Sequence, residues 1–355
     1  MKTEDFNYNL PENLIAQTPE KERTSSKLMI LDKTTGKIKH EQFKNIIKYL
    51  KKGDVLVLNN TKVIPARLIG EKEETKAIIE LLLLKEIKKD TWECLVKPAR
   101  RVKKGTIITF SPKLKAKCLE THQEGICTFQ MIYKGLLLEI LEDLGTMPLP
   151  PYIHEKLKDK NRYQTVYAKY PGSAAAPTAG LHFTKELLEK IKEKGVIICY
   201  ITLHVGLGTF RPVKEENIKN HQMHSEYFEM SKETSEILTK AKQEKRRIIS
   251  VGTTTTRTLE SIYTKYKKFK STKEETNIFI YPGYKFKAID IQITNFHLPK
   301  STLIMLISAF ATKEIILNAY QEAIKNKYRF FSFGDSMMIG DFINDKNEIW
   351  TNKNK

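Results

Sequence analysis

Two hydrophobic patterns divide this chain of 355 residues. Between Arg67 and about Pro150, short apolar runs are separated by turn-forming or charged residues, a spacing typical of a small antiparallel β-barrel. Elsewhere, apolar runs alternate with amphipathic stretches, as in strands joined by helices. Within the first pattern six strands are predicted, at residues 77–84, 91–96, 105–110, 114–119, 125–133 and 136–141.

The C-terminal half predicts strands and helices in alternation. A nearly continuous apolar strand at Val196–Leu203 follows a helix that begins near Thr184 and ends at Gly195. A polar helix capped by Ser231 precedes a strand at Ile248–Val251, which leads through four threonines into a second helix. Further strands are predicted at residues 278–281 and 289–293, and helices between about 301 and 327.

We therefore expect an α/β fold with two domains. A mixed sheet with flanking helices is formed by both ends of the chain, residues 1–66 and 151–355, and an antiparallel β-barrel of residues 67–150 is inserted between them. The chain also exceeds the usual size of a single core. The prolines between Pro148 and Tyr152 resist helix and central strand, so this segment is predicted to return the chain to the larger domain.

Composition narrows the class of protein. The net charge of +19 suits a polyanionic partner such as nucleic acid, although a general excess of lysine has the same effect. The four cysteines show no C-x-x-C spacing and are expected to be reduced, buried thiols of a cytoplasmic protein. The N-terminus lacks the apolar core of a signal peptide, and no apolar run approaches the ~20 residues of a membrane span.

Two segments, 172–184 and 204–212, place glycines close to a histidine or arginine, and a third, 221–226, contains two histidines and a glutamate without a glycine. Small residues let a ligand approach the backbone, and an imidazole can move a proton near neutral pH. Five of the eight histidines lie between residues 182 and 297. Any one of them is explained at least as well by hydrogen bonding at a loop end, but the group points to a site.

Other motifs are less specific. Gly206 and Gly208 lack the third glycine of a dinucleotide-binding fingerprint. His221, His224 and Glu226 have neither a cysteine partner nor the spacing of a zinc motif, so we expect no metal. Gly252 and the four threonines after it follow a strand and open a helix, where free N–H groups favour an anion. Simple N-capping explains the threonines equally well.

These segments closely resemble S-adenosylmethionine:tRNA ribosyltransferase-isomerases, a family of queuosine biosynthesis. The resemblance spans nearly the whole chain and implies the two-domain arrangement described above. It departs mildly where Asn60 and Lys62 replace the more usual Asp and Arg, where Thr255-Thr256 replaces Ser-Val, and where Ala174 replaces Val. Further matching segments are Leu58–Arg67, Val251–Ser261, Thr294–Leu303 and Phe333–Met337.

The resemblance implies a reaction on tRNA with a GUN anticodon. The ribosyl part of S-adenosylmethionine moves to the amine of 7-aminomethyl-7-deazaguanine at the wobble position and is rearranged into an epoxycyclopentanediol. Epoxyqueuosine-tRNA forms, and adenine and methionine leave. S-adenosylmethionine is then a co-substrate, no permanently bound cofactor is needed, and we expect a monomer without membrane contact.

The reaction calls for a base that takes a proton from the ribose carbon beside the sulfonium and an acid that assists the departure of adenine. The expected catalytic residues are His182, His204, His224 and Glu226. We expect Arg257 and the Thr253-Thr254 turn to hold the methionine carboxylate or a tRNA phosphate, and Lys62 and Arg67 to contact tRNA. The full set of expected substrate-binding residues is Thr178, Gly180, Gly206, Thr209, Arg211, Thr253, Thr254, Arg257, Asn295, His297 and Asp335.

Two alternative functions remain open. An S-adenosylmethionine-dependent RNA methyltransferase would share the co-substrate and the basic charge, but its glycine-rich turn near the N-terminus is not visible in the sequence. A non-catalytic RNA-binding module built on the barrel is the other. A group of proton-transfer residues argues against a passive module.

Overall fold

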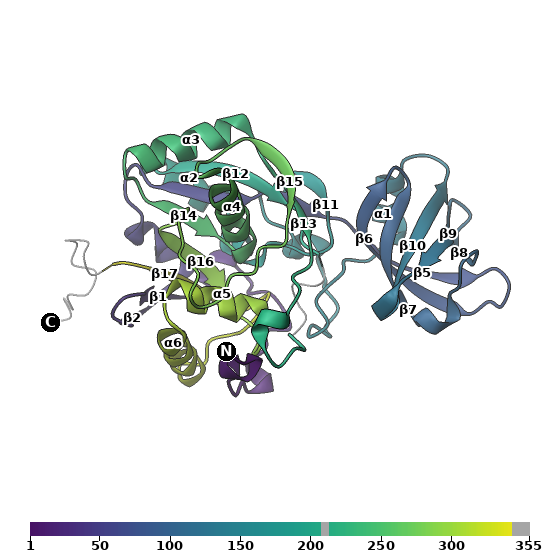
Figure 1. The fold of residues 1–355 in the computed structure, drawn as a ribbon, viewed down its shortest axis with the longest axis horizontal. Coiled ribbons are helices and arrows are strands. Elements are labelled where there is room, and N and C mark those ends of the chain that lie inside the picture. Colours follow the sequence, from purple (N-terminus) through teal and green to yellow (C-terminus); the bar gives the residue numbers. More distant parts are fainter. Residues whose placement is uncertain (207–212, 343–355) are drawn as a thin grey trace.

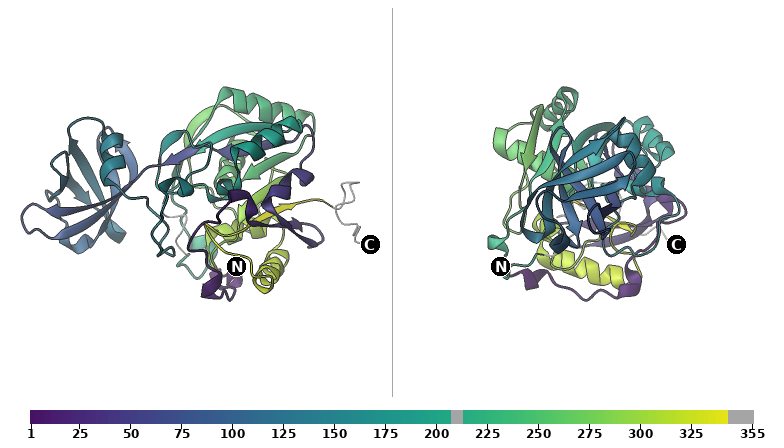
Figure 2. Two further views of the ribbon diagram at one scale, coloured as in Figure 1. Left: turned by 180° about the vertical axis from the view of Figure 1, so that it is seen from behind. Right: turned by 90° about the vertical axis from the view of Figure 1, so that its right-hand side faces the viewer.

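The computed structural model describes residues 1–206 and 213–342, which form a large α/β body and a smaller barrel beside it (Figure 1). Both ends of the chain contribute to the α/β body, as predicted. Figure 2 shows that the barrel is joined to the body through a narrow connection. Residues Thr209, Arg211 and the tail at 351–355 lie outside the described residues.

A nine-stranded mixed sheet forms the centre of the body. Strands before and after the barrel interleave in it, in the order β15-β13-β12-β3-β14-β16-β17-β1-β2. The four neighbours from β12 to β16 are parallel to one another. The bounds are β1 (Lys27–Asp32), β2 (Ile38–Gln42), β3 (Val55–Asn59), β12 (Ile197–Leu203), β13 (Glu226–Met230), β14 (Ile248–Val251), β15 (Thr272–Thr276), β16 (Ile291–Asn295) and β17 (Ser336–Gly340).

Helices cover both faces of this sheet. Successive side chains of a strand point to opposite faces, so Leu56 and Leu58 pack toward α2 and the 3₁₀-helix η4, whereas Val55 and Val57 pack toward the other helices. The bounds are η4 (Phe43–Tyr49), α2 (Lys185–Glu193), α3 (Lys232–Gln243), α4 (Thr253–Tyr266), α5 (Thr302–Phe310) and α6 (Lys313–Lys325).

The predicted helix starts are confirmed by their caps. The side chain of Thr184 accepts a hydrogen bond from the Leu187 N–H, and that of Ser231 accepts one from the Thr234 N–H. The predicted strand at Ile278–Tyr281 is wrong, because the strand of that region is β15. The apolar residues of this segment pack against the core, Ile280 being 1% exposed, without joining a ladder.

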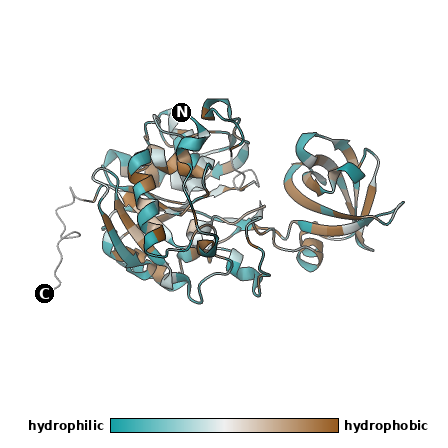
Figure 3. Cartoon of the chain, turned by 90° about the horizontal axis from the view of Figure 1, so that it is seen from below, coloured by the Kyte–Doolittle hydropathy of each residue, from teal (hydrophilic) through white to brown (hydrophobic). Residues whose placement is uncertain are grey.

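The inserted segment forms a closed barrel in the order β10-β7-β6-β5-β8-β9. Its apolar strands are seen in brown in Figure 3. The strand predicted at residues 136–141 is wrong: this stretch lies in helix α1 (Leu137–Leu144), with Ile140 and Leu141 buried and Leu138 exposed. The sixth strand is β5. The bounds are β5 (Arg67–Lys72), β6 (Ile78–Lys88), β7 (Thr91–Lys97), β8 (Ile107–Ser111), β9 (Leu114–Thr121) and β10 (Ile126–Tyr133).

The two chain crossings between body and barrel are tied together. Before the barrel, β4 (Thr61–Val63) pairs in parallel with β11 (Tyr170–Ser173). At the barrel itself, Arg67 and Thr146 exchange backbone hydrogen bonds of 3.3 and 2.9 Å. Entry and exit of the insertion therefore lie side by side. The exact domain boundaries at 66/67 and 150/151 stay predictions.

Two further predictions concern bulk properties. The four cysteines are free and buried, as predicted, and burial raises the pKa of Cys118 to about 11. Within residues 1–206 and 213–342, no single helix is long and apolar enough to cross a membrane; α5 and α6 together pass by length and composition, with a bend of 114° between them.

Candidate active site

The predicted motifs converge at one edge of the sheet. The parallel strands β12, β3, β14 and β16 end there side by side. His204 follows β12, Thr61 lies just beyond β3, Gly252 follows β14 and His297 lies just beyond β16. Ligands of open α/β sheets bind at this carboxyl edge, because the loops that leave the strands meet there.

A cleft of about 780 Å³ lies between the barrel and the α/β body. Its volume falls within the ~300–1,000 Å³ typical of small-molecule sites. The body contributes glycines and histidines of the predicted motifs, and the barrel contributes aromatic side chains and charged side chains of both signs, Lys85 and Lys89 among them. The principal lining residues are Gly172, His204, Gly206, His224 and Glu226 from the body, and Glu86, Asp90, Trp92, Glu93 and Tyr133 from the barrel.

His204 faces the cleft with a fixed ring. Its Nδ1 lies 2.7 Å from Thr61 Oγ1, and the ring stacks on Tyr227 at 6.0 Å between centroids. Gly172 has a φ of +142°, and a Cβ there would lie 3.0 Å from the His204 ring, so only glycine fits without strain. Burial lowers the pKa of His204. Its Nε2 makes no hydrogen bond with a described residue.

His224 contacts a buried carboxylate. The Nε2 of His224 lies 3.3 Å from Glu226 Oε1, which also accepts a hydrogen bond of 3.1 Å from the Gly206 N–H. The other oxygen, Oε2, forms an ion pair with the Nη2 of Arg257. Both charged side chains of this pair are 1% exposed. The three groups therefore form a chain from the helix α4 to the cleft.

Glu226 is ionised in this environment. Burial opposes its charge, but Arg257, His224 and the Gly206 N–H together outweigh burial and lower the pKa of Glu226 to about 2. The ion pair is formed through the Nη2 of Arg257. The Nε and Nη1 of the same guanidinium have no hydrogen-bond partner among the described residues. Arg257 thus faces Glu226 inside the protein and does not line the cleft.

A second group of predicted residues is buried beneath the same edge. His182 lies between two partners, with Nδ1 at 2.8 Å from Ser26 Oγ and Nε2 at 3.1 Å from Asn295 Nδ2. Asn295 in turn accepts a hydrogen bond of 3.0 Å from Thr178 Oγ1 and donates one of 3.4 Å to the Asp335 carbonyl. We call these five residues the buried network. It contains three of the predicted substrate residues, Thr178, Asn295 and Asp335.

The titratable groups of the buried network are held in place. Burial, assisted by Arg23, lowers the pKa of His182 to about 3, so its ring is neutral. Burial raises the pKa of Asp335, whose carboxylate accepts hydrogen bonds from the backbone N–H groups of Lys27 and Arg329. These bonds tie two loops together.

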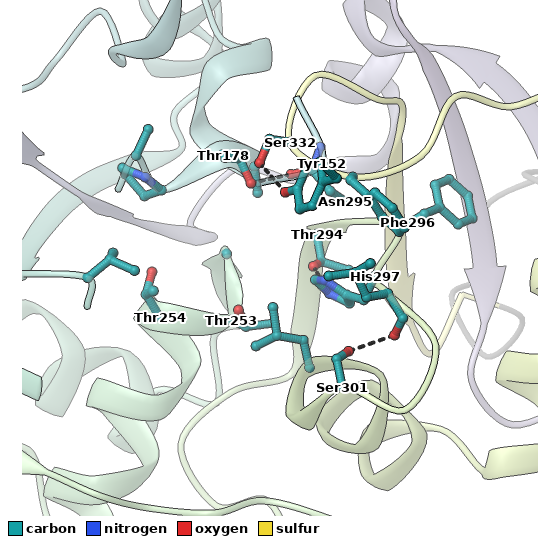
Figure 4. Close-up of a pocket in the computed structure, with 18 residues that line it drawn as sticks. Tyr152, Thr178, Thr253, Thr254, Thr294, Asn295, Phe296, His297, Ser301 and Ser332 are labelled. Carbon is teal, nitrogen blue, oxygen red and sulfur yellow. Dashed lines mark hydrogen bonds between the residues drawn. The ribbon is translucent and has the colours of Figure 1, made fainter. Parts of the chain in front are cut away.

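A narrow pocket lies between the starts of α4 and α5 (Figure 4). Thr253 and Thr254 lie on its α4 side, and His297 and Ser301 lie on its α5 side. The Nε2 of His297 is 2.7 Å from Thr294 Oγ1, and burial lowers the pKa of His297 to about 3.

Other predicted residues have separate environments. A Cβ on Gly180 would lie 2.0 Å from the Tyr167 hydroxyl, so this glycine provides packing space for an aromatic ring. Lys62 lies 3.6 Å from Glu142 and Arg67 lies 3.7 Å from Glu80, at the connection between body and barrel. The other two, Thr209 and Arg211, lie outside the described residues.

Sequence reasoning missed part of the cleft. Thr61 and Gly172 lie in the motif segments, but the sequence did not predict a catalytic or binding role for them. Asp90, Trp92 and Tyr133 were not identified, because the strand pattern of a barrel does not tell which end faces another domain. Tyr133 donates a hydrogen bond of 2.5 Å to Asp90, and the indole N–H of the buried Trp92 has no partner among the described residues.

No group of three or more His, Cys, Asp or Glu side chains in residues 1–206 and 213–342 is arranged to hold a metal ion. The expectation of a metal-free site stays a prediction.

Comparison with known proteins decides the family. The family described as "Queuosine biosynthesis protein" matches residues 3–339. The chain belongs to this family. Relatives from two strains of Staphylococcus epidermidis, both named S-adenosylmethionine:tRNA ribosyltransferase-isomerase, are 58% identical over 340 residues, which cover 96% of this chain and 100% of each relative.

A solved member of the family has a similar fold. The crystal structure of an S-adenosylmethionine tRNA ribosyltransferase from Thermotoga maritima matches with a TM-score of 0.55 and 40% identity. The match covers 94% of this chain and 99% of that protein. The fold predicted from the family resemblance is therefore confirmed.

Proposed function

We propose that the chain is an S-adenosylmethionine:tRNA ribosyltransferase-isomerase. It transfers the ribosyl part of S-adenosylmethionine to 7-aminomethyl-7-deazaguanine at the wobble position of tRNA and isomerises it, which gives epoxyqueuosine-tRNA, adenine and methionine. The names of relatives at 58% identity support the activity. The structural observation that carries it is the cleft, where His204 and His224 face one space large enough for a small-molecule substrate.

The reaction needs three proton movements. The ribose carbon beside sulfur loses a proton, helped by the adjacent sulfonium. Adenine leaves more readily when it is protonated, and the tRNA amine must be neutral to attack. The histidines of the cleft supply groups that can take or give a proton near neutral pH.

His204 is the better base. The lowered pKa of its ring keeps the imidazole neutral at pH 7. When Nδ1–H donates to Thr61 Oγ1, the lone pair of Nε2 is left for a proton from the substrate. Gly172 leaves room for that ring, because a Cβ there would lie 3.0 Å from it.

His224 serves as the second proton-transfer group. The ionised Glu226 holds the imidazole of His224 with its proton on Nε2, in the way that a buried carboxylate orients a catalytic histidine. Because Arg257 already neutralises Glu226, little negative charge remains to offset the sulfonium. Glu226 and Arg257 are therefore positioning residues.

His182 acts through Asn295 and the loops that they join. Both of its ring nitrogens are hydrogen-bonded and its ring is stacked on Phe43 at 4.9 Å between centroids. A ring fixed in this way holds the carboxyl edge of the sheet in shape and does not exchange protons with a substrate.

The tRNA binds across the body and the barrel, as the charge of +19 favours. Lys62 and Arg67 lie at the connection between body and barrel, close in sequence to the cleft residue Ile64. There they contact the phosphates of the tRNA. The finer features of this proposal are a GUN anticodon, a monomer acting in the cytoplasm and the absence of a permanently bound cofactor.

One assay tests the function. The chain is incubated with S-adenosylmethionine and tRNA that carries the aminomethyl base, and tRNA carrying guanine at the same position is the matched control, since guanine lacks the nucleophilic amine. Release of adenine and methionine in equal amounts, with the first tRNA alone, is the expected result. Release of S-adenosylhomocysteine would identify a methyltransferase, and tRNA binding without products would identify a binding module.

A further inference from the structure

Two helix starts face one pocket in this protein. α4 is 14 residues long and begins after Gly252, and α5 is 9 residues long and begins after Ser301. The first N–H groups of a helix lack partners within it, and the helix dipole places partial positive charge there. The pocket of Figure 4 lies between these two ends, so both favour an anion at the same place.

The polar groups of the pocket point to a ligand independently of the helices. Thr253 is 6% exposed, and its hydroxyl makes no hydrogen bond with a described residue. His297 is 8% exposed and bonds to Thr294 through Nε2. When Nε2 accepts that bond, Nδ1–H is a donor without a partner among the described residues. Both residues line the pocket, so the hydroxyl and the ring N–H are two donors that a ligand in the pocket can use.

The size and walls of the pocket restrict what can enter. The open space is about 50 Å³, several times the ~10–15 Å³ that one ordered water needs. No charged side chain lines it, and several walls are apolar, among them Val205, Phe296 and Leu303. This space suits a small group such as a carboxylate at the end of a ligand, since whole small-molecule sites are typically ~300–1,000 Å³.

We propose that this pocket binds the α-carboxylate of the methionine end of S-adenosylmethionine. The inference rests on the proposed function. Val205 lines the pocket, and its neighbours His204 and Gly206 line the cleft, so a co-substrate anchored by its carboxylate extends toward the cleft histidines. The hydroxyls of Thr178 and Ser332 lie in the same lining and can accept hydrogen bonds from the α-ammonium group.

Arg257 is not the carboxylate ligand that the sequence suggested. It lies on α4 beyond Thr253, but it is paired with Glu226 and lines neither the pocket nor the cleft. The negative charge is therefore bound by helix ends and neutral donors, as at other anion sites of helix N-termini.

The test compares S-adenosylmethionine with an analogue that lacks the carboxylate, in wild type and in three variants. S-adenosylmethionine is assayed with the aminomethyl tRNA for kcat/KM, and decarboxylated S-adenosylmethionine, which lacks only the carboxylate, is assayed as a competitive inhibitor for Ki. The variants are Thr253→Val, Thr253→Ser as the conservative change, and Thr258→Val as a matched control on the same helix, since the Thr258 hydroxyl bonds to the Thr254 carbonyl.

We expect wild type to bind the decarboxylated compound at least ~10-fold more weakly than S-adenosylmethionine, as loss of a hydrogen-bonded charged group implies. Thr253→Val should lower kcat/KM for S-adenosylmethionine by ~10-fold without changing the Ki. Thr253→Ser and Thr258→Val should leave both values within about threefold of wild type, because serine keeps the hydroxyl that faces the pocket and Thr258 does not line the pocket.

Other outcomes overturn the inference. Equal effects of Thr253→Val on both values would show that no carboxylate contacts this residue, and equal binding of both compounds by wild type would place the carboxylate elsewhere. A raised KM for tRNA alone would assign the pocket to a phosphate. In each case adenine release by wild type still supports the proposed function, whereas no release at all would refute that function instead.

Discussion

The histidines of the cleft and those of the buried interior occupy opposite environments, although their sequence motifs look alike. His204 and His224 lie at an opening between two domains, and each is fixed on one side. His182 is fixed on both sides, and with His297 it is buried to less than a tenth exposure. Only the first pair lines the cleft, where a substrate can exchange protons with it.

The difference lies in desolvation and satisfied hydrogen bonds. A fully buried imidazole without a nearby carboxylate loses the free energy of hydration of its charged form, so its pKa falls to about 3. At the cleft, a carboxylate whose charge is secured by Arg257 contacts His224. Whether a histidine can transfer a proton therefore depends on the groups that surround it in the folded protein more than on its sequence motif.

The largest expected effect distinguishes the two groups by turnover. Replacing His204 or His224 with Gln should lower the single-turnover rate by about 10²–10⁴-fold at saturating substrate, because a positioned acid or base contributes that much. tRNA binding and the unfolding midpoint should stay near wild type. The control His221→Gln removes a histidine that pairs with Glu215 outside the cleft lining, and should react within threefold of wild type. Normal rates in both cleft variants would place the chemistry elsewhere.

The ion pair behind the cleft should show its effect in stability. Glu226→Gln leaves the guanidinium of Arg257 buried without its carboxylate, which should cost about 3–5 kcal/mol of unfolding free energy. Urea denaturation measures the loss. The control is Glu229→Gln on the same strand, whose half-exposed ion pair with Lys273 is worth about 1 kcal/mol or less. Similar losses in both variants would contradict a special role for the buried pair.

Acid should destabilise the protein through the buried histidines. The unfolded chain binds protons at His182 and His297 below about pH 6.5, whereas the folded chain does not until about pH 3. The free energy of unfolding should thus fall as the pH drops through this window, by up to about 1.4 kcal/mol per pH unit for each histidine. Urea titrations at pH 7, 6 and 5 should give a shallower fall for His182→Gln, and an unchanged pH dependence would argue against a neutral buried ring.

Two glycines offer a matched comparison of the two groups. Gly180→Ala should cost about 1–3 kcal/mol of stability, because its Cβ meets the Tyr167 hydroxyl, and Tyr167→Phe in the same chain should restore part of it. Gly172→Ala places a Cβ against the His204 ring, at a residue whose φ is +142°. Turnover should therefore fall by more than the loss of stability explains. Equal stability losses with normal turnover in both would remove the distinction.

The smallest effect concerns the connection between the domains. If tRNA binding neutralises about five phosphates, log affinity should fall against log salt with a slope near −3 to −5. Lys62→Ala should weaken that slope by about one. Lys232→Ala, on an exposed side chain of α3 that lines neither cavity, is the control and should leave it unchanged. A flat response in wild type would show that the charge of +19 is compositional.

Local pattern was sufficient for most elements of this protein. The apolar run of β12, the Ser231 cap and the glycine before α4 are local signals, and each was placed correctly. The stretch at 136–141 was misassigned because its leucines and isoleucine suit a helix face as well as a strand. The segment at 278–281 was misassigned because burial by packing leaves the same apolar signature as burial in a sheet.

The family was also readable from the sequence alone, since its motif residues are grouped in short segments, whereas the site residues stay predictions. The environment of each side chain was decided by the tertiary structure. His182 contacts Ser26, which lies 156 residues earlier in the sequence, and Glu226 on β13 pairs with Arg257 on α4. Charge state depends on burial and on such distant partners, because desolvation and Coulomb interactions act through space and not along the chain.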